Sequence, residues 1–391
     1  MKPPRSISVL GSTGSVGRST LALIEAAPPG ALAVEALVAG SDSAALAAQA
    51  RRHRPRLAVV ADPAAHGALR DALAGTGIET AAGADAVVEA AAYPADWTMA
   101  AIVGAAGLRS TLAALGRGGV LALANKESLV CAGAIVLAAA RRSGATLLPV
   151  DSEHNAIFQA LDLRDPAMVE KIVLTASGGP CRAMDQAEMR AVTPEVALRH
   201  PVWKMGAKIS IDSATMMNKG LELIEAAHLF PVPEERIEVL VHPQSAVHGL
   251  VQYADGSVLA QLGTPDMRTP IAHALAWPGR MAVSLPRLDL AALGRLEFLP
   301  PDPVRFPALR LARDALRAGK GAPVVLNAAN EVAVALFLDR RLGFLGIAEV
   351  VEEALEALGA PPVRSLDDAL ALDAEARREA VRMAARRSAA A

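Results

Sequence analysis

Short runs of Val, Ile, Leu and Ala alternate with helix-forming segments over the first 150 residues of the chain. Each run ends at a Gly or at polar residues, which is typical of strands buried in a sheet. We expect strands at residues 6–10, 33–39, 57–60, 99–103, 120–123 and 146–148. We expect the intervening helices at residues 18–27, 44–53, 64–74, 108–116 and 130–143. This alternation predicts an α/β fold with a doubly wound parallel sheet of Rossmann type.

The pattern changes after residue 150. Apolar runs at 172–175, 237–241, 247–253 and 257–262, with helical segments between them, predict a central α+β domain, and Asp255-Gly256 predicts a hairpin. Helical periodicity at 308–318, 324–339, 347–358 and 366–386 predicts a C-terminal helical bundle. Prolines recur where periodicity is weak, which indicates a connecting segment. We therefore expect domains at 1–150, 151–276 and 305–391, with a linker at 277–304.

Composition sets limits on function. The chain has 391 residues, of which 52% are hydrophobic and 3% aromatic, and its formal net charge is −2. Interspersed charges that nearly balance argue against a nucleic-acid partner or a polybasic membrane surface. Cys131 and Cys181 lack a metal-ligand spacing, so both are expected to be small buried side chains. With no signal-peptide pattern and no long apolar segment, we expect no membrane association and a cytoplasmic protein.

A glycine-rich turn, GSTGSVG at residues 11–17, joins the first expected strand to the first expected helix. Glycine lets the backbone approach a pyrophosphate, and the helix N-terminus offers N–H groups with a partial positive charge. In the context of the βα repeat, the turn predicts dinucleotide binding, with hydroxyl donors from Thr13 and Ser15. The second strand ends at Ser41 and Asp42, and this late acidic residue favours NADP over NAD.

Two carboxylates follow the sixth expected strand, in Asp151-Ser152-Glu153. In an extended segment, side chains at i and i+2 point to one face, and adjacent carboxylates repel each other unless a cation lies between them. The same residues also fit a helix N-cap followed by a first-turn glutamate. This stretch alone leaves a metal site and a helix cap as equal alternatives.

Three further segments could contribute to a site. Asn125-Lys126-Glu127 follows the fifth strand, at the sheet edge where α/β proteins bind ligands. Residues 175–180 form a Ser/Gly turn whose hydroxyls and amides suit a phosphate. Residues 199–206 combine Gly, Pro and Trp203, as a mobile lid would. Ordinary turns and loops explain each of these segments as well.

The richest polar run of the second half spans residues 209–222. Glu222 and Glu225 lie three residues apart on an expected helix and could face a common neighbour. Spacing alone does not decide which of them would bind a metal, and solvated surface glutamates are the alternative.

Taken together, several long strings closely resemble the 1-deoxy-D-xylulose 5-phosphate reductoisomerase family. They are non-repetitive and run in order through nearly the whole chain. The strings are GSTGSVG (11–17), AAIVGAAG (100–107), LANKESLV (123–130), LPVDSEHNAIFQ (148–159), SGGP (177–180), KISIDSATMMNKGLE (208–222), HPQS (242–245), PDMRTPIA (265–272) and NAANE (327–331).

The resemblance implies an NADPH-dependent oxidoreductase that also needs one divalent cation, Mn²⁺, Mg²⁺ or Co²⁺. Such an enzyme rearranges 1-deoxy-D-xylulose 5-phosphate and reduces the product to 2-C-methyl-D-erythritol 4-phosphate, in the non-mevalonate route to isoprenoids. The implied metal ligands are Asp151, Glu153 and Glu222, whose oxygens suit a hard cation, and Lys126 joins them as a catalytic residue. The family also implies a homodimer, an NADPH-binding role for residues 1–150 and a catalytic role for 151–276.

The resemblance also assigns binding residues. Those implied for the substrate, a small phosphorylated ketose, are Lys126, Ser152, Glu153, Ser177, His200, Trp203, Ser213, Asn218, Lys219 and Glu222. Those implied for the cofactor are Thr13, Gly14, Ser15, Val16, Gly40, Ser41, Asp42, Asn125, Glu127 and Gly206. The lid is expected near 198–208, with Trp203 and Met205 closing over the substrate.

One departure concerns NADPH preference. Some family members carry a basic residue after the second strand, where this chain has Ser41-Asp42. Arg51 and Arg52 could pair with the 2′-phosphate instead, although a solvated helix face is the more usual role for such residues.

Two other functions remain as alternatives. A metal-independent NADP dehydrogenase of a small aldehyde or hydroxy acid would turn over in EDTA. An NADP-sensing regulator would bind cofactor without turnover.

Overall fold

The computed structural model describes residues 4–162, 164–203 and 205–390. Internal contacts divide the chain into two compact units. The first consists of Met1–Ser128, Ala134–Asp151 and Met267–Ser284, and the second of Leu129–Gly133, Ser152–Asp266 and Leu285–Ala391. No helix in the described part of the chain combines the length and the apolar character needed to cross a membrane.

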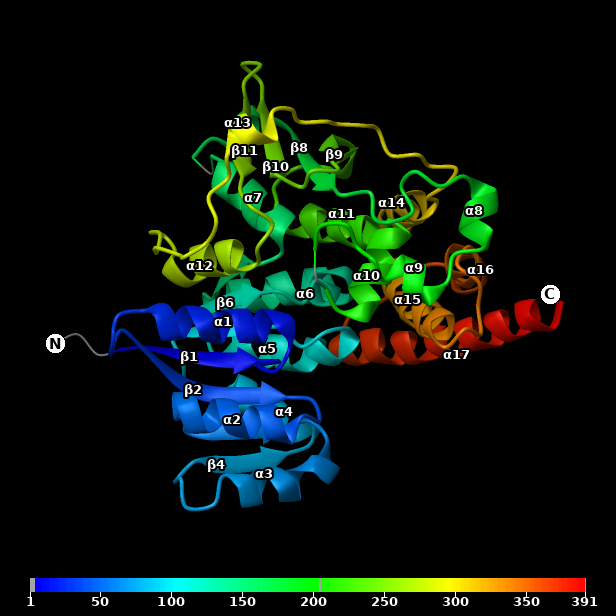
Figure 1. Ribbon diagram of the computed structural model, residues 1–391. Coiled ribbons are helices and arrows are strands. Elements are labelled where there is room, and N and C mark those ends of the chain that lie inside the picture. The colour runs from blue at the N-terminus through cyan, green and yellow to red at the C-terminus, as the bar shows by residue number, and fades with distance from the viewer. Residues whose placement is uncertain (1–3, 163, 204, 391) are drawn as a thin grey trace. The chain divides into compact units, whose positions relative to one another are not determined.

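A seven-stranded sheet forms the centre of the first unit (Figure 1), and every neighbouring pair of its strands is parallel. The strands are β1 (Arg5–Leu10), β2 (Leu32–Ala39), β3 (Leu57–Val60), β4 (Glu79–Ala82), β5 (Trp97–Ala100), β6 (Val120–Leu123) and β7 (Thr146–Pro149). Their order is β4-β3-β2-β1-β5-β6-β7. The direction of winding therefore reverses between β1 and β5, and α/β proteins bind ligands beyond the strand ends at such a point.

Helices complete the first unit and confirm the doubly wound pattern. They are α1 (Ser15–Ala26), α2 (Ser43–His53), α3 (His66–Ala72), α4 (Ala84–Ala91), α5 (Leu108–Gly116), most of α6 (Glu127–Ser143) and α12 (Arg268–Ala276). Helix α12 comes from much later in the chain and packs on β6 and β7. The buried Trp97 indole donates a hydrogen bond of 3.1 Å to the Ala274 carbonyl, which ties α12 to this sheet.

Three described elements of this unit were not predicted from the sequence: strand β4 and helices α4 and α12. Strand β4 has only four residues and is only partly buried, so it shows little contrast between apolar and polar positions. The strand expected at 99–103 was placed too late, because β5 ends at Ala100 and Val103 is 70% exposed. Helix α1 begins three residues before the expected start, directly on the glycine-rich turn.

The second unit contains a four-stranded mixed sheet in the order β11-β10-β8-β9. Its strands are β8 (Val169–Ala176), β9 (Ile237–Val241), β10 (Val247–Tyr253) and β11 (Val258–Leu262). Strand β10 is antiparallel to β8 and β11, which confirms the expected hairpin, and β8 is parallel to β9. Helices α7 (Ser152–Ala160) and α11 (Met217–Leu229) pack against this sheet.

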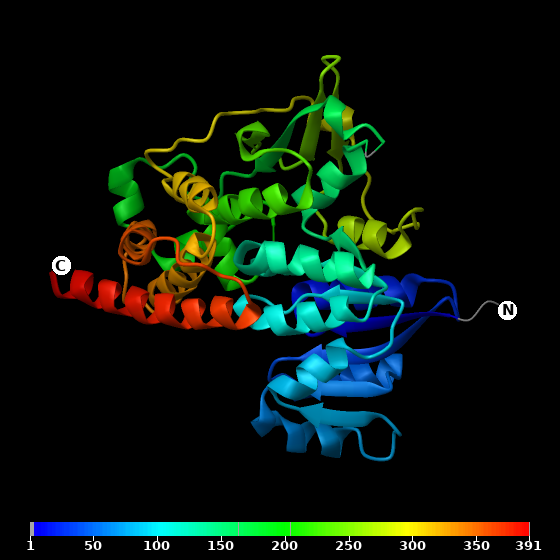
Figure 2. The same cartoon turned by 180° about the vertical axis from the view of Figure 1, so that it is seen from behind.

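The remaining helices of this unit include the expected C-terminal bundle. They are α8 (Gln186–Arg190), α9 (Pro194–Ala197), α10 (Ala207–Ala214), α13 (Leu290–Leu293), α14 (Ala308–Ala318), α15 (Ala322–Leu338), α16 (Gly346–Leu358) and α17 (Leu366–Ala390). Short 3-10 turns lie at Pro63–Ala65, Ala105–Gly107, Pro166–Met168 and Glu234–Arg236. Helices α14–α17 cluster together in both views (Figures 1 and 2), and α15 is buried along most of its length.

The bundle is continuous with the central region. Helix α14 packs on α11 and helix α15 packs on α10 as well as on α16 and α17. The contact-based units thus differ from the expected four-part division, which concerned functional domains and stays a prediction.

Replacing Gly17 by Ala is expected to lower the free energy of unfolding by about 1–3 kcal/mol, because a Cβ there would lie 2.3 Å from the Gly11 carbonyl oxygen. Gly67→Ala is the matched control, since α3 has open space around that position and Ala favours the helix. Calorimetry should show a lower Tm for the first variant and an unchanged or higher Tm for the second. Equal Tm values would contradict the packing argument.

Candidate functional site

The glycine-rich turn between β1 and α1 has no room for larger residues. Gly11 has φ +88°, and a Cβ on it would lie 2.5 Å from the Ala101 carbonyl oxygen. Gly14 is the N-cap of α1, and no described side chain caps that helix end. The first N–H groups of α1 therefore remain available to an anionic ligand. This geometry fits the pyrophosphate of a dinucleotide, as the sequence motif predicts.

The other candidate cofactor residues of the first unit follow the ends of nearby parallel strands. Residues 40–42 follow β2 and are exposed, and residues 125–127 follow β6 and are buried. Asp42 accepts a hydrogen bond of 2.9 Å from the Ala45 amide and so caps α2. Its carboxylate is thus engaged with the helix that follows β2.

Arg51 and Arg52, which could have replaced the missing basic residue, are engaged elsewhere. Arg51 donates to the Ala72 carbonyl, with 3.0 Å from its Nε, and Arg52 pairs with Glu25 at 2.6 Å. In this conformation neither guanidinium serves the loop after β2.

Asn125 braces the loop that follows β5. Its Nδ2 donates to the Gly104 carbonyl at 3.0 Å, and a Cβ on Gly107 would lie 3.0 Å from the same nitrogen. Beside it, the buried Lys126 forms an ion pair of 2.7 Å with the partly buried Asp151. The segment after β6 therefore shapes the sheet edge and also holds the first carboxylate of the expected metal set.

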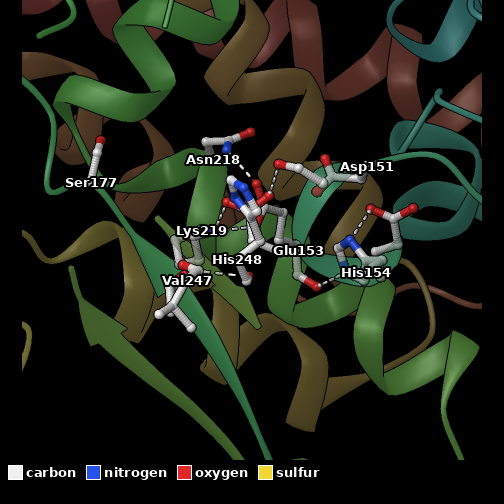
Figure 3. A network of polar contacts seen from close by, with 12 residues as sticks. Asp151, Glu153, His154, Ser177, Asn218, Lys219, Val247 and His248 are labelled. Carbon is white, nitrogen blue, oxygen red and sulfur yellow. Dashed lines mark hydrogen bonds and ion pairs between the residues drawn. The ribbon is translucent and has the colours of Figure 1, made fainter. Parts of the chain in front are cut away.

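A buried lysine bridges two glutamates in the second unit (Figure 3). The Lys219 ammonium lies 2.8 Å from Glu153 Oε1 and also pairs with Glu222, while Asn218 donates its side-chain amide to Glu222. The side chains of Lys219 and Glu222 are only 4% and 1% exposed. Glu153 lies in the first turn of α7, and the other three residues lie on α11.

The start of α7 corrects one expectation. Ser152 already begins the helix, so Asp151 and Glu153 do not share a face of an extended strand as argued from the sequence. The chain nevertheless keeps them close: one carboxylate oxygen from each of Asp151, Glu153 and Glu222 lies within 4.8 Å of the others. Three carboxylates at this separation are an all-oxygen donor set of the kind that Mg²⁺ and Mn²⁺ prefer.

His154 and Glu225 lie directly behind this cluster, and the sequence did not single out His154. Its Nδ1 lies 3.4 Å from Glu225, and its Nε2 contacts the Glu222 carbonyl oxygen at 2.9 Å. With Asp151 they form a second group of possible ligands, which contains nitrogen. The all-oxygen group containing Glu222 suits a hard cation better. The signal that could have found His154 is its position next to Glu153 at the start of an amphipathic helix.

His200 Nε2 and Ser177 Oγ form a hydrogen bond of 2.8 Å. His200 Nδ1 accepts from the Trp203 amide at 2.8 Å, so the ring proton must reside on Nε2 and is donated to Ser177 Oγ. The Gly179 amide also donates to this oxygen, at 3.1 Å. With two donors directed at its oxygen, the Ser177 hydroxyl can give its own proton to a phosphate.

The backbone of Ser213 lies next to the same turn. A Cβ on Gly179, which has φ +65°, would lie 2.6 Å from the Ser213 carbonyl oxygen. The structure therefore brings together Ser177, His200 and Ser213 among the expected phosphate residues. Asn218 and Lys219 instead point to the carboxylates, and Ser177 stands apart from them in Figure 3.

One residue of the expected lid segment, Trp203, lies beside His248 of β10. The Trp203 ring lies 6.0 Å from the His248 ring, measured between centroids, at an interplanar angle of 59°. Burial lowers the pKa of His248 to about 4, and the charge of Lys219 adds to the effect. Gly206 is the N-cap of α10, and Lys204 lies outside the described residues. From the sequence, His248 was expected to have a structural role, and its position beside the lid segment was not predicted.

Fold and site together define an α/β dinucleotide-binding enzyme with a carboxylate cluster suited to a hard divalent cation. The family model of 1-deoxy-D-xylulose 5-phosphate reductoisomerase matches residues 7–133, and models of the C-terminal domain match 147–230 and 262–379. The chain belongs to the 1-deoxy-D-xylulose 5-phosphate reductoisomerase family, as the sequence strings predicted.

Curated relatives agree over nearly the full length. Proteins named 1-deoxy-D-xylulose 5-phosphate reductoisomerase from Rhodospirillum centenum and Zymomonas mobilis are 62% and 56% identical to this chain. Each alignment covers 97% of this chain, with 94% and 98% of the respective relative.

Solved structures confirm the fold class. The Zymomonas mobilis enzyme in complex with NADPH has a TM-score of 0.92 at 54% identity, covering 97% of this chain and 99% of that one. A DOX-P reductoisomerase in complex with NADPH, fosmidomycin and magnesium also has a TM-score of 0.92, at 44% identity, covering 97% of this chain and 98% of that one.

The His200 contact predicts a pH-dependent stability. Burial places the pKa of His200 below its ordinary value of 6.5, so its stabilising contribution is present above pH 6.5 and is lost as pH falls through the lowered pKa. Protonation of Nδ1 would remove the acceptor for the Trp203 amide. We expect Tm to decrease more steeply below pH 6.5 in the wild type than in His200→Asn, which can accept there but cannot be protonated.

This comparison separates His200 from the other histidines whose pKa burial lowers, because they remain in both proteins. Identical pH profiles of Tm would contradict the assignment.

Proposed function

We propose that the chain catalyses the NADPH- and divalent-metal-dependent conversion of 1-deoxy-D-xylulose 5-phosphate to 2-C-methyl-D-erythritol 4-phosphate, in the non-mevalonate route to isoprenoid precursors. The observation that carries this is the carboxylate group Asp151, Glu153 and Glu222, in a chain of this family with an open dinucleotide turn. Relatives in complex with NADPH and with magnesium support both cofactors.

The metal would be held by Asp151, Glu153 and Glu222. When bound, it supplies a Lewis acid that polarises the substrate carbonyl and stabilises negative charge during the rearrangement. Lys126 orients the Asp151 carboxylate through their 2.7 Å ion pair and presents a positive charge at the reacting end. Lys219 balances the charge of the two glutamates and keeps their carboxylates together, and Ser152 lies between Asp151 and Glu153 at the start of α7.

The phosphate end of the substrate would lie at the turn after β8. Ser177 donates its hydroxyl proton to a phosphate oxygen, because His200 and Gly179 already supply the donors to Ser177 Oγ. Ser213 lies against the same turn, and Asn218 and Lys219 complete the substrate set. Trp203 and Met205 belong to the segment that would exclude water when it closes.

NADPH would bind at the strand ends of the first unit, with its pyrophosphate at Thr13, Gly14, Ser15 and Val16. Gly40, Ser41 and Asp42 would lie near the ribose and the 2′-phosphate, and Asn125 and Glu127 near the nicotinamide half. Gly206 is the last of the residues that we propose to contact the cofactor. Since Asp42 caps α2, its charge is partly neutralised by the helix N-terminus and opposes a phosphate less.

Asp151→Asn, Glu153→Gln and Glu222→Gln should each lower NADPH oxidation with the ketose phosphate by about 100-fold or more, since even second-shell changes at metal sites cost 10- to 100-fold. NADPH binding, measured by fluorescence, should survive in each variant. Glu238→Gln is the control, because that carboxylate pairs with Lys171 on the surface.

The same assay tests the proposal as a whole. Wild-type protein should oxidise NADPH with Mn²⁺ and 1-deoxy-D-xylulose 5-phosphate, and EDTA should abolish the reaction. Full turnover in EDTA would favour the metal-independent dehydrogenase, and binding without turnover would favour a regulator.

We also propose that the protein is a cytoplasmic homodimer. Strand β11 lies at an edge of its sheet, and its residues Val258 and Leu259 are each 51% exposed. An apolar edge strand without Lys or Pro is suited to pairing with another chain. Cys131 and Cys181 are both buried and not joined in a disulfide, as expected from the sequence and as is usual in a reducing compartment.

Leu259→Lys is expected to shift the protein from dimer to monomer at micromolar concentration, because a charge at the edge strand opposes pairing. Val381→Lys is the control, since that residue is similarly exposed, at 48%, on α17. Sedimentation velocity measures the result. A dimer that withstands Leu259→Lys would exclude β11 as its interface.

A further inference from the structure

The matched string NAANE lies at residues 327–331 on α15. None of its residues belongs to the site described so far. Its fourth residue, Asn330, is completely buried and donates its side-chain amide to Asp212 Oδ1 at 2.8 Å. Asp212 lies on α10, in the polar run that leads to Ser213. The contact thus joins the C-terminal bundle to the helix at the proposed phosphate turn.

Asp212 is a buried carboxylate with a partner for each oxygen. It is 1% exposed, and its other oxygen pairs with Lys208 at 2.8 Å. A buried charge is costly unless hydrogen bonds satisfy it. Lys208 is on the same helix, so it cannot anchor α10 to anything else through this pair. Of the two partners of Asp212, Asn330 is the one that connects α10 to a second element, α15.

The position of α10 matters because the end of this helix is tightly packed against the turn that contains Gly179. The Ser213 carbonyl lies against Gly179, where even a Cβ would come within 2.6 Å. Gly179 in turn donates its amide to Ser177 Oγ. At its other end, α10 begins at Ala207 with Gly206 as its N-cap, so its first residues belong to the expected lid segment at 198–208. A shift of α10 would therefore displace Ser213 and disturb the turn that carries Ser177.

Asn327, one turn earlier on α15, is a natural comparison. It is also completely buried, but its amide donates at 3.0 Å to Glu331, which pairs with Arg377 on α17. The two asparagines share a helix, a side chain and a degree of burial. They differ in that one reaches α10 and the other stays within the bundle.

We propose that Asn330 and Asp212 are positioning residues for the phosphate pocket, holding α10 so that Ser213 and the Ser177 turn keep their spacing. This inference rests on the proposed role of Ser177 and Ser213 in phosphate binding. It assigns to the C-terminal bundle a part in substrate affinity, exerted through a single buried amide.

The test compares Asn330→Ala with Asn327→Ala in the full-length protein. Both should lower Tm, because each removes a buried hydrogen bond. Only Asn330→Ala should raise KM for 1-deoxy-D-xylulose 5-phosphate, by about 10-fold, with a smaller change in kcat and no change in KM for NADPH. Inorganic phosphate, titrated calorimetrically without metal, should bind more weakly to this variant alone. Equal KM and phosphate affinity in two variants with similar Tm would overturn the proposal.

A charge swap provides the rescue. Asn330→Asp places two carboxylates together in the core and should raise KM further than Asn330→Ala. Adding Asp212→Asn restores a donor toward residue 330 and leaves an oxygen for Lys208, so KM should return toward the wild-type value. Failure of the double variant to recover, when it folds with a Tm above that of Asn330→Asp, would contradict the pairwise mechanism. A wild-type protein without turnover would instead refute the proposed function.

Discussion

The ion pairs of Lys219 with Glu153 and Glu222 are the interaction on which the site depends. Buried glutamates repel one another and would protonate or move apart without a compensating charge. The ammonium group satisfies both, at 2.8 Å from Glu153, and in doing so connects α7 to α11. Held in this way, the carboxylate oxygens of Asp151, Glu153 and Glu222 lie within 4.8 Å of one another, the spacing on which the proposed cation site rests.

Ordinary packing restrains the backbone segments that carry the candidate site residues. His154 contacts the backbone of Glu222, and the turn at Gly179 presses on the end of α10. The C-terminal helices contact α10, next to the turn of Ser177, through Asn330 and Asp212. In the first unit, the absence of side chains at Gly11 and Gly17 lets β1 pass directly into α1. Each of these hydrogen bonds and close contacts restrains a backbone segment that carries residues of the proposed site.

Much of the fold followed from the sequence, because strong periodicity coincides with strong burial. The strand at 57–60, the helix at 108–116 and the hairpin after β10 were placed correctly, and so was the helix at 308–318. Strand β4 was missed because it has only four residues and no buried position, so it shows no alternation of buried and exposed side chains. The position of α12 beside β6 and β7 could not be predicted either, since nothing local marks a helix that returns to an earlier sheet.

By itself, the sequence determined the parallel sheet, the glycine-rich turn and, through its matched strings, the family. Those features depend on residue type and on short-range spacing, which a single chain displays. Only the tertiary structure decided which carboxylates meet. Glu222 and Glu225 were equivalent by spacing, and the packing of α11 placed Glu222 beside Glu153 and Lys219 while Glu225 faces His154. Distances between residues some 70 positions apart arise from packing, which no local pattern records.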